Sequence, residues 1–174
     1  MLTFIPGTTV MHSAHGPATV TGHETRQIKG VAVEYVKLSV LTNALSVSVP
    51  IDRASELGIR PLLSEQQIHD LFDVLRSESA PEDKQWSRRF KPNAERLASG
   101  DTFTSVARDI YRRREFRGVS TGERDQLEAA FKPIRTELRL VLDAPTEEID
   151  QMLVAAILER GHEPREGSRS PLAS

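Results

Sequence analysis

The sequence predicts an α+β protein in which a small N-terminal β-barrel module precedes an all-helical C-terminal domain. Between residues 4 and 50, β-branched residues alternate with polar ones and turn signals recur, a pattern typical of short strands. Beyond Pro61, the apolar residues recur at helical spacing instead. The chain has 174 residues, which is enough for one or two small domains.

The composition excludes several classes of protein and of site. Cysteine is absent, so disulfides, thiolate zinc sites and cysteine nucleophiles are excluded, which suits a reducing cytoplasm. The longest apolar run, Met152 to Leu158, is far shorter than the roughly 20 residues that span a bilayer. The first basic residue is Arg26, so no signal peptide is expected. We therefore expect a cytoplasmic protein without a membrane partner.

The clearest predicted strands lie at residues 31–40 and 45–49, where apolar residues fall at every second position and would line one sheet face. The Lys29-Gly30 pair closes a hairpin between residues 24–28 and 31–40. About five short strands in about 50 residues are too few for a two-sheet sandwich. We therefore expect a strongly bent barrel that covers its own core.

A capping box at Ser64-Glu65-Gln66-Gln67 begins the first predicted helix, whose apolar stripe is Ile68, Leu71, Phe72 and Leu75. Residues 77–84 are polar and acidic, which predicts a linker. The next helix, at 86–98, contains Pro92, which costs about 3 kcal/mol inside a straight helix. We expect this helix either to kink there or to restart near Asn93.

Three further helices and a tail are predicted in the rest of the chain. Asp101 caps a helix that ends near Gly118, with a buried stripe of Phe103, Val106, Ala107, Ile110 and Tyr111. A second capping box, Ser120-Thr121-Gly122-Glu123, begins a long helix that Pro145 stops, and a short last helix follows with Ile149, Met152, Leu153, Ala156 and Ile157. Residues 161–174 combine Gly, Pro, Ser and charges, which predicts a disordered tail.

Charged residues are distributed unevenly along the chain. The expected segments are a β module at 1–62, a capped helix with an acidic linker at 63–83, a helical domain at 84–160 and the tail at 161–174. The net charge is −2, yet residues 84–139 hold 14 Lys and Arg against 8 Asp and Glu, whereas 63–83 hold 1 against 6. Because charges act over about 10 Å at 0.1 M salt, the basic segment indicates a local anionic partner.

Catalytic motifs are missing from the sequence. It contains no Gly-rich phosphate loop, nucleophile elbow or EF-hand pattern. His12 and His15 are the only histidines close enough to suggest paired metal ligands, and a metal site would need a third ligand from elsewhere in the fold. We therefore expect a binding protein rather than an enzyme, without a cofactor, a metal or a small-molecule substrate.

The basic segment contains two arginine clusters. Trp86-Ser87-Arg88-Arg89-Phe90-Lys91 places three cations beside two aromatic residues, and the next helix carries Arg108, Arg112, Arg113, Arg114 and Arg117. Guanidinium groups suit phosphate contacts because they donate a planar fork to anionic oxygens. The alternative is a solvated helix face that pairs internally with Asp109 and Glu115. Trp86 is likewise either a core residue or an exposed aromatic that wedges into the minor groove.

The order of these features resembles the CarD family of bacterial transcription regulators, also called CdnL, over about residues 3–160. The segments that carry the resemblance are Gly7-Thr8-Thr9-Val10, His15-Gly16-Pro17-Ala18, Glu24-Thr25-Arg26-Gln27-Ile28-Lys29-Gly30, Val47-Ser48-Val49-Pro50, Trp86-Ser87-Arg88-Arg89-Phe90-Lys91, Leu97-Ala98-Ser99-Gly100-Asp101 and Arg117-Gly118-Val119-Ser120-Thr121-Gly122-Glu123-Arg124. The resemblance implies a Tudor-like N-terminal domain that binds the β subunit of RNA polymerase, as the corresponding module of transcription-repair coupling factor does. It also implies a helical domain that touches promoter DNA.

The resemblance also implies roles for individual residues. In the family, a tryptophan at the upstream edge of the transcription bubble wedges into the minor groove and slows bubble collapse. That role falls on Trp86, and the positions beside it imply largely sequence-independent phosphate contacts by Arg88, Arg89, Lys91 and Arg124. Arg26 matches a polymerase-contacting arginine of the family. These roles imply a nucleoid-associated protein.

This sequence departs from the family pattern in places. Ser48 stands where the family often has a second polymerase-contacting arginine, which removes a charge-assisted hydrogen bond. Pro92 stands next to the DNA-facing motif, where the family has a residue compatible with a helix.

The sequence also admits two other functions. The main alternative is a protein-protein adaptor whose basic helices bind an acidic protein partner rather than DNA. A helix-turn-helix repressor is disfavoured, because no recognition helix preceded by a short Gly turn is evident.

Overall fold

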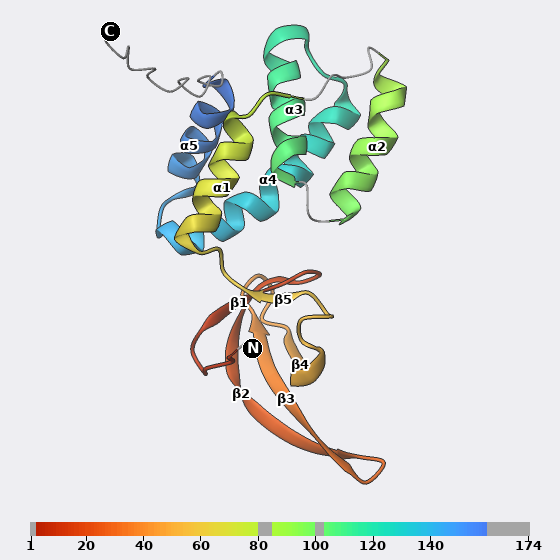
Figure 1. Cartoon of the computed structure of the whole chain (residues 1–174), viewed down its shortest axis with the longest axis vertical. Helices are drawn as coiled ribbons and strands as arrows, with labels where there is room; N and C mark the ends of the chain where they lie inside the picture. Colours follow the sequence, from red (N-terminus) through yellow and green to blue (C-terminus); the bar gives the residue numbers. More distant parts are fainter. Residues whose placement is uncertain (1–2, 80–84, 100–102, 160–174) are drawn as a thin grey trace, which may run out of the picture.

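The structure is a computed structural model that describes residues 3–79, 85–99 and 103–159. A curled β-sheet formed by the N-terminal part lies against a bundle of helices formed by the rest (Figure 1). This arrangement confirms the predicted α+β class. The expected tail at 161–174, most of the acidic linker and the capping residue Asp101 lie outside the described residues.

The sheet contains β1 (Thr9–His12), β2 (Gly16–Ile28), β3 (Val31–Val40), β4 (Ser46–Pro50) and β5 (Ile59–Pro61), with the short 3-10 helix η1 (Ile51–Arg53) between β4 and β5. All neighbouring strands are antiparallel, in the order β4-β3-β2-β1-β5. The predicted β2–β3 hairpin is present. Its two turn residues, Lys29 and Gly30, both have positive φ angles, of 50° and 80°, as the tight hairpin turns require.

A register shift between Val20 and Gly22 bends β2 where it crosses the core. Gly22 has a φ of 158°, at the edge of the region that favours glycine. The curved sheet buries one face against itself, as the sequence predicted. The buried residues of this module are Phe4, Val10, Ala18, Val20, Val36, Leu38, Val40, Val49, Ala54 and Ile59.

The helices are α1 (Glu65–Arg76), α2 (Trp86–Ser99), α3 (Phe103–Arg117), α4 (Thr121–Leu142) and α5 (Thr146–Leu158). Both predicted capping boxes are confirmed, at Ser64 and at Ser120. The predicted restart near Asn93 is wrong, because α2 continues through Pro92. Pro92 is exposed on this helix. None of the described helices is long and apolar enough to cross a membrane.

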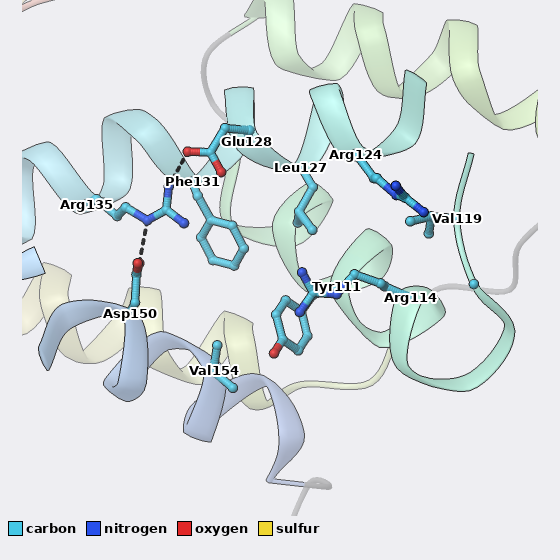
Figure 2. Close-up of a pocket in the computed structure, with 11 residues that line it drawn as sticks. Tyr111, Arg114, Val119, Arg124, Leu127, Glu128, Phe131, Arg135, Asp150 and Val154 are labelled. Atoms are coloured by element: carbon cyan, nitrogen blue, oxygen red, sulfur yellow. Dashed lines mark hydrogen bonds and ion pairs between the residues drawn. The ribbon is translucent and has the colours of Figure 1, made fainter. Parts of the chain in front are cut away.

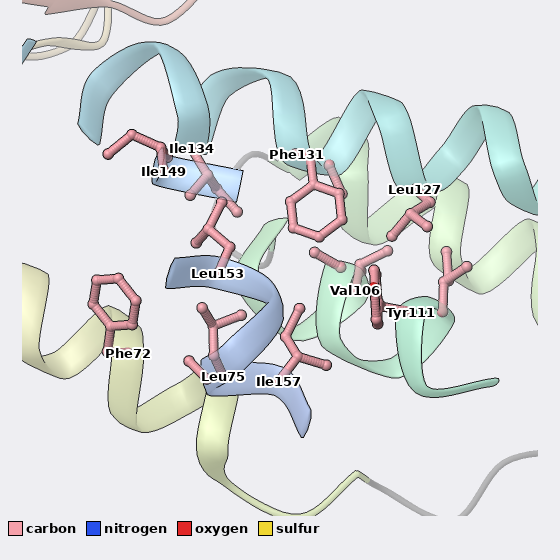
Figure 3. Packing of buried hydrophobic residues seen from close by; sticks show 14 of the residues in the cluster. Phe72, Leu75, Val106, Tyr111, Leu127, Phe131, Ile134, Ile149, Leu153 and Ile157 are labelled. Atoms are coloured by element: carbon pink, nitrogen blue, oxygen red, sulfur yellow. The ribbon is translucent and has the colours of Figure 1, made fainter. Parts of the chain in front are cut away.

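The second core lies between α1, α3, α4 and α5 (Figure 3). Phe72 and Leu75 of α1 belong to this core, and Leu75 is fully buried. The first helix is therefore an integral part of the helical domain, whereas the sequence suggested a separate segment at 63–83. Among the described side chains of α2, the partly buried Leu97 packs against this core.

Candidate functional site

The two residues expected to bind polymerase lie side by side on the outer face of the sheet. Arg26 is on β2 and Ser48 is on β4, and the register places both on the same side as Val33 and Lys37 of β3, the strand between them. The Nη2 atom of Arg26 lies 3.5 Å from the Ser48 Oγ and donates to it. The sheet thus joins two positions that are 22 residues apart in the sequence.

Neighbouring side chains hold the Arg26 guanidinium in place. It donates through Nε to Glu24, and its centre lies 4.9 Å from the centroid of the Tyr35 ring. Lys37 Nζ is 2.8 Å from the other Glu24 oxygen. Hydrogen bonds from Arg26 and Lys37 lower the pKa of Glu24 to about 2, so this carboxylate stays ionised at neutral pH. The face therefore presents two cations around one carboxylate.

The same face becomes apolar toward the end of the hairpin. Ile28 and Val31 are paired across the turn and are 43% and 63% exposed. Ile28 is two residues beyond Arg26, so the two side chains are on one side of the sheet. Sequence reasoning missed the roles of Glu24, Tyr35 and Lys37, although the alternation of residues 31–40 already placed the last two on one face.

Residues of the expected DNA-binding set lie on α2 and at the start of α4. Trp86 is the first residue of α2, and its side chain lies outside the described part of the structure. Arg88 is exposed, and the Lys91 side chain is 85% exposed, with Nζ 4.0 Å from Glu95. Arg124 is exposed in the first turn of α4.

Direct packing brings α2 against the beginning of α4. A Cβ atom added at Gly122 would come within 3.0 Å of the Phe90 ring, so the glycine permits a close approach. Gln126 Nε2 also donates to the Phe90 carbonyl at 2.9 Å. Helix α2 is therefore packed directly on the beginning of α4, the helix that carries Arg124.

Arg89, in contrast, points inward. Its side chain is only 10% exposed, and its Nη2 lies 3.1 Å from Glu123 Oε1. Arg113 Nε lies 3.6 Å from the same oxygen, and the Ser120 backbone N–H and hydroxyl donate to the other oxygen at 3.0 Å. This placement favours an internal role for Arg89, which holds α2 against α4, over the expected phosphate contact.

The ionisation of Glu123 follows from these contacts. Burial by itself would raise the pKa of this carboxyl. The hydrogen bonds from Ser120 and Arg89 outweigh that effect, and the pKa of Glu123 lies below its ordinary value. Glu123 therefore combines two tasks, the capping box of α4 and a buried ion pair with α2.

Two arginines of α3 also serve the fold. Arg108 is 6% exposed and donates to the Val74 carbonyl and to Ser77 Oγ at 3.0 and 2.6 Å. Arg112 donates to backbone carbonyls at the ends of α1 and α5, namely those of Leu75, Arg76, Ser77 and Ile157. Carbonyls at a helix C-terminus lack helical partners and attract cations. This placement favours an internal role for Arg108 and Arg112 over the suggested phosphate contact.

A groove of about 620 Å³ lies between α3, α4 and α5 (Figure 2). Its floor is apolar, with Leu127, Phe131 and Val154. At one end Arg135 is neutralised by ion pairs to Glu128 and Asp150. At the other end lie Arg114, stacked 4.2 Å from the centroid of the Tyr111 ring, and Arg124 of the expected DNA-binding set. This end extends the cationic surface beyond α2.

The structure offers no metal site in its described residues, where no group of three or more ligand side chains is found. The rings of His12 and His15 stand 4.6 Å apart. His12 Nδ1 accepts a hydrogen bond from the Ala14 backbone N–H, so one of its two nitrogens is already used. His12 is the last residue of β1, and His15 lies in the turn that follows it.

Comparison with known proteins identifies both parts of the chain. Residues 4–63 match the family model described as the CarD-like/TRCF RID domain, and residues 70–154 match the CarD C-terminal domain. A Bacillus subtilis (strain 168) protein, YdeB, described as a candidate transcription factor, is 18% identical over 137 residues, which cover 78% of this chain and 90% of YdeB. The solution structure of the 72-residue N-terminal domain of Myxococcus xanthus CarD matches with 20% identity and a TM-score of 0.30, covering 35% of this chain and 81% of that domain.

Proposed function

Because this chain belongs to the CarD family of transcription regulators, we propose that it binds the β subunit of RNA polymerase and stabilises the open promoter complex. The β module makes the polymerase contact, and the helical domain makes contacts to the minor groove and to phosphates at the upstream edge of the bubble. The contact between Arg26 and Ser48 carries this proposal, because it places both expected polymerase-binding positions on one exposed face.

The polymerase-binding face has a defined chemistry. Arg26 and Lys37 are exposed around the ionised Glu24, and the Arg26 guanidinium lies over the Tyr35 ring. Such a face suits a partner with a carboxylate opposite Arg26 and an apolar contact for Ile28. Ser48 can accept or donate one neutral hydrogen bond at the position where the family often has an arginine, which weakens the contact.

In this proposal the DNA contacts come from the helical domain. We assign phosphate contacts to Arg88, Lys91 and Arg124, which are exposed on α2 and α4, and the minor-groove wedge to Trp86. Arg89 contributes indirectly, since its ion pair with Glu123 holds α2 in place.

Weak DNA contacts suffice in this arrangement. Polymerase binding holds the helical domain beside the promoter at a high effective concentration, so a modest contact that is independent of sequence gains occupancy. The protein alone should accordingly bind DNA weakly and with a strong dependence on salt.

The test measures the binding of the full chain to core polymerase and the lifetime of the open complex. Arg26→Glu should abolish polymerase binding while both parts of the chain stay folded, because the Arg26 side chain is exposed. Lys132→Glu, the matched charge reversal on an exposed residue of α4, should bind like the unsubstituted chain. Normal binding by a folded Arg26→Glu variant would refute the polymerase site.

Trp86→Ala tests the DNA part of the proposal. The variant should bind polymerase normally and shorten the open-complex lifetime, because it removes only the wedge. An unchanged lifetime would instead favour the adaptor function, in which the helical domain binds an acidic protein. A core tryptophan would behave differently again, since its removal costs about 3 to 5 kcal/mol of stability.

A further inference from the structure

A buried carboxylate on α4 joins the β module to the helical domain. Glu137 is only 4% exposed, and its two oxygens accept from both terminal nitrogens of Arg60 at 2.5 and 2.7 Å. The first of these oxygens also accepts from the Leu63 backbone N–H at 2.9 Å. Arg60 belongs to β5, whereas Leu63 packs against the helical core, so Glu137 binds the chain on both sides of the junction.

We propose that Arg60 and Glu137 are positioning residues that fix the orientation of the β module relative to the helices, and thereby the spacing between the polymerase contact and the DNA contact. The functional half of this inference rests on the proposed function. The geometric half is independent of it, because it concerns only the relation between the two parts of the chain.

The geometry of the pair restricts rotation. A planar guanidinium that donates two parallel hydrogen bonds to one carboxylate sets both the distance and the relative tilt of the two groups. The hydrogen bonds that Arg60 donates to Glu137 raise the pKa of Arg60, so this guanidinium stays charged at any ordinary pH. Only residues 62–64 connect β5 to α1, which leaves little slack around this contact.

The helix that carries Glu137 extends its effect to the DNA-binding region. Glu123, near the other end of α4, holds α2 through Arg89. The two carboxylates are 14 residues apart, which corresponds to about 21 Å along a helix. Helix α4 therefore connects the β module to α2, the helix that begins with Trp86 (Figure 1).

Loss of the pair should leave each part folded and free to turn about residues 62–64. Two linked binding sites reinforce each other only when the link lets both engage together. Polymerase binding should then persist, since Arg60 lies on β5 and Arg26 on β2, while the contribution of the helical domain to the open complex falls.

The orientation can be measured directly because the chain has no native cysteine. Spin labels on Thr25→Cys and Gln151→Cys, at exposed positions of β2 and α5, report the distance between the two parts in the full-length protein. We expect one narrow distance distribution in the unsubstituted background and a broadened one in Arg60→Gln and in Glu137→Gln. Arg53→Gln, which breaks an exposed ion pair within the same module, should leave it narrow.

Arg60→Gln should keep its polymerase affinity and shorten the open-complex lifetime by at least about threefold. Arg60→Lys keeps the charge but cannot donate two parallel hydrogen bonds. Its open-complex lifetime should therefore lie between those of the unsubstituted chain and Arg60→Gln. Narrow distributions in both Arg60→Gln and Glu137→Gln would overturn the fixed orientation, and a broad distribution with an unchanged lifetime would overturn its functional role. Failure of the unsubstituted chain to bind polymerase would overturn the proposed function, and the distance distribution would still decide the orientation.

Discussion

Glu123→Gln removes one negative charge from the centre of the contact between α2 and α4 and preserves the shape of the side chain. The carboxylate is 3% exposed and faces two guanidinium groups, of Arg89 and Arg113, that are 10% and 9% exposed. Such largely buried cations cannot recover full hydration when the carboxylate is lost. The substitution therefore tests whether the ion pair holds α2 in place.

The expected loss is about 3 kcal/mol of unfolding free energy. Removing one member of a buried ion pair costs about 3 to 5 kcal/mol, and the lower end applies because the amide oxygen of glutamine still accepts one hydrogen bond. For a chain of this length, such a loss lowers the melting temperature by about 6 to 12 °C. Urea or thermal unfolding followed by circular dichroism measures both quantities.

Glu128→Gln is the matched control, since it makes the same change on the same helix. Its side chain is 67% exposed in an ion pair with Arg135, so the loss should stay below about 1 kcal/mol. Equal losses in the two variants, or a loss below about 1 kcal/mol in Glu123→Gln, would refute the argument that burial makes the Glu123 pair important.

Lowering the pH should reduce the difference in stability between the unsubstituted chain and Glu123→Gln. The pKa of Glu123 lies below its ordinary value of 4.5, so the carboxylate stabilises the folded state fully above about pH 4.5. This stabilisation is lost as the pH falls through the depressed folded-state pKa. The gap in stability between the unsubstituted chain and Glu123→Gln should therefore be largest near pH 7 and shrink below about pH 4.5. A gap that stays constant on acidification would contradict this assignment.

Other substitutions address the two proposed interfaces and the helix ends. Ser48→Arg should tighten polymerase binding, as measured by interferometry, because it supplies a charged donor beside Arg26; an unchanged or weaker affinity would mean that the interface lies elsewhere. Lys91→Ala should lower the slope of log affinity against log salt for DNA by about one, and an unchanged slope would exclude its phosphate contact. Arg112→Ala should cost about 2 to 3 kcal/mol in urea unfolding, because carbonyls of α1 and α5 lose a charged donor; a loss near zero would contradict its capping role.

Local patterns in the sequence determined the elements of this protein. Both capping boxes, at Ser64 and Ser120, formed as predicted, and so did the hairpin closed by Lys29 and Gly30. These features depend on residues within four positions of each other, so a short stretch of sequence contains all the groups involved. The face that we propose binds polymerase is only partly local: its residues alternate along β2 and β3, but their meeting with Ser48 required the sheet.

The tertiary structure alone decided what each arginine does. Arg89, Arg108 and Arg112 have the same charge and similar neighbours in sequence to Arg88 and Lys91, yet they are turned inward to a carboxylate or to helix ends. Arg108 does pair with its neighbour Asp109, as one reading of the sequence suggested, but the partners in other helices lie between 31 and 45 residues away along the chain. Composition and periodicity show that a cation is present. The packing of distant helices decides whether water, phosphate or protein surrounds that cation. The physical reason is that burying a guanidinium is favourable only where hydrogen-bonding or charged partners surround it.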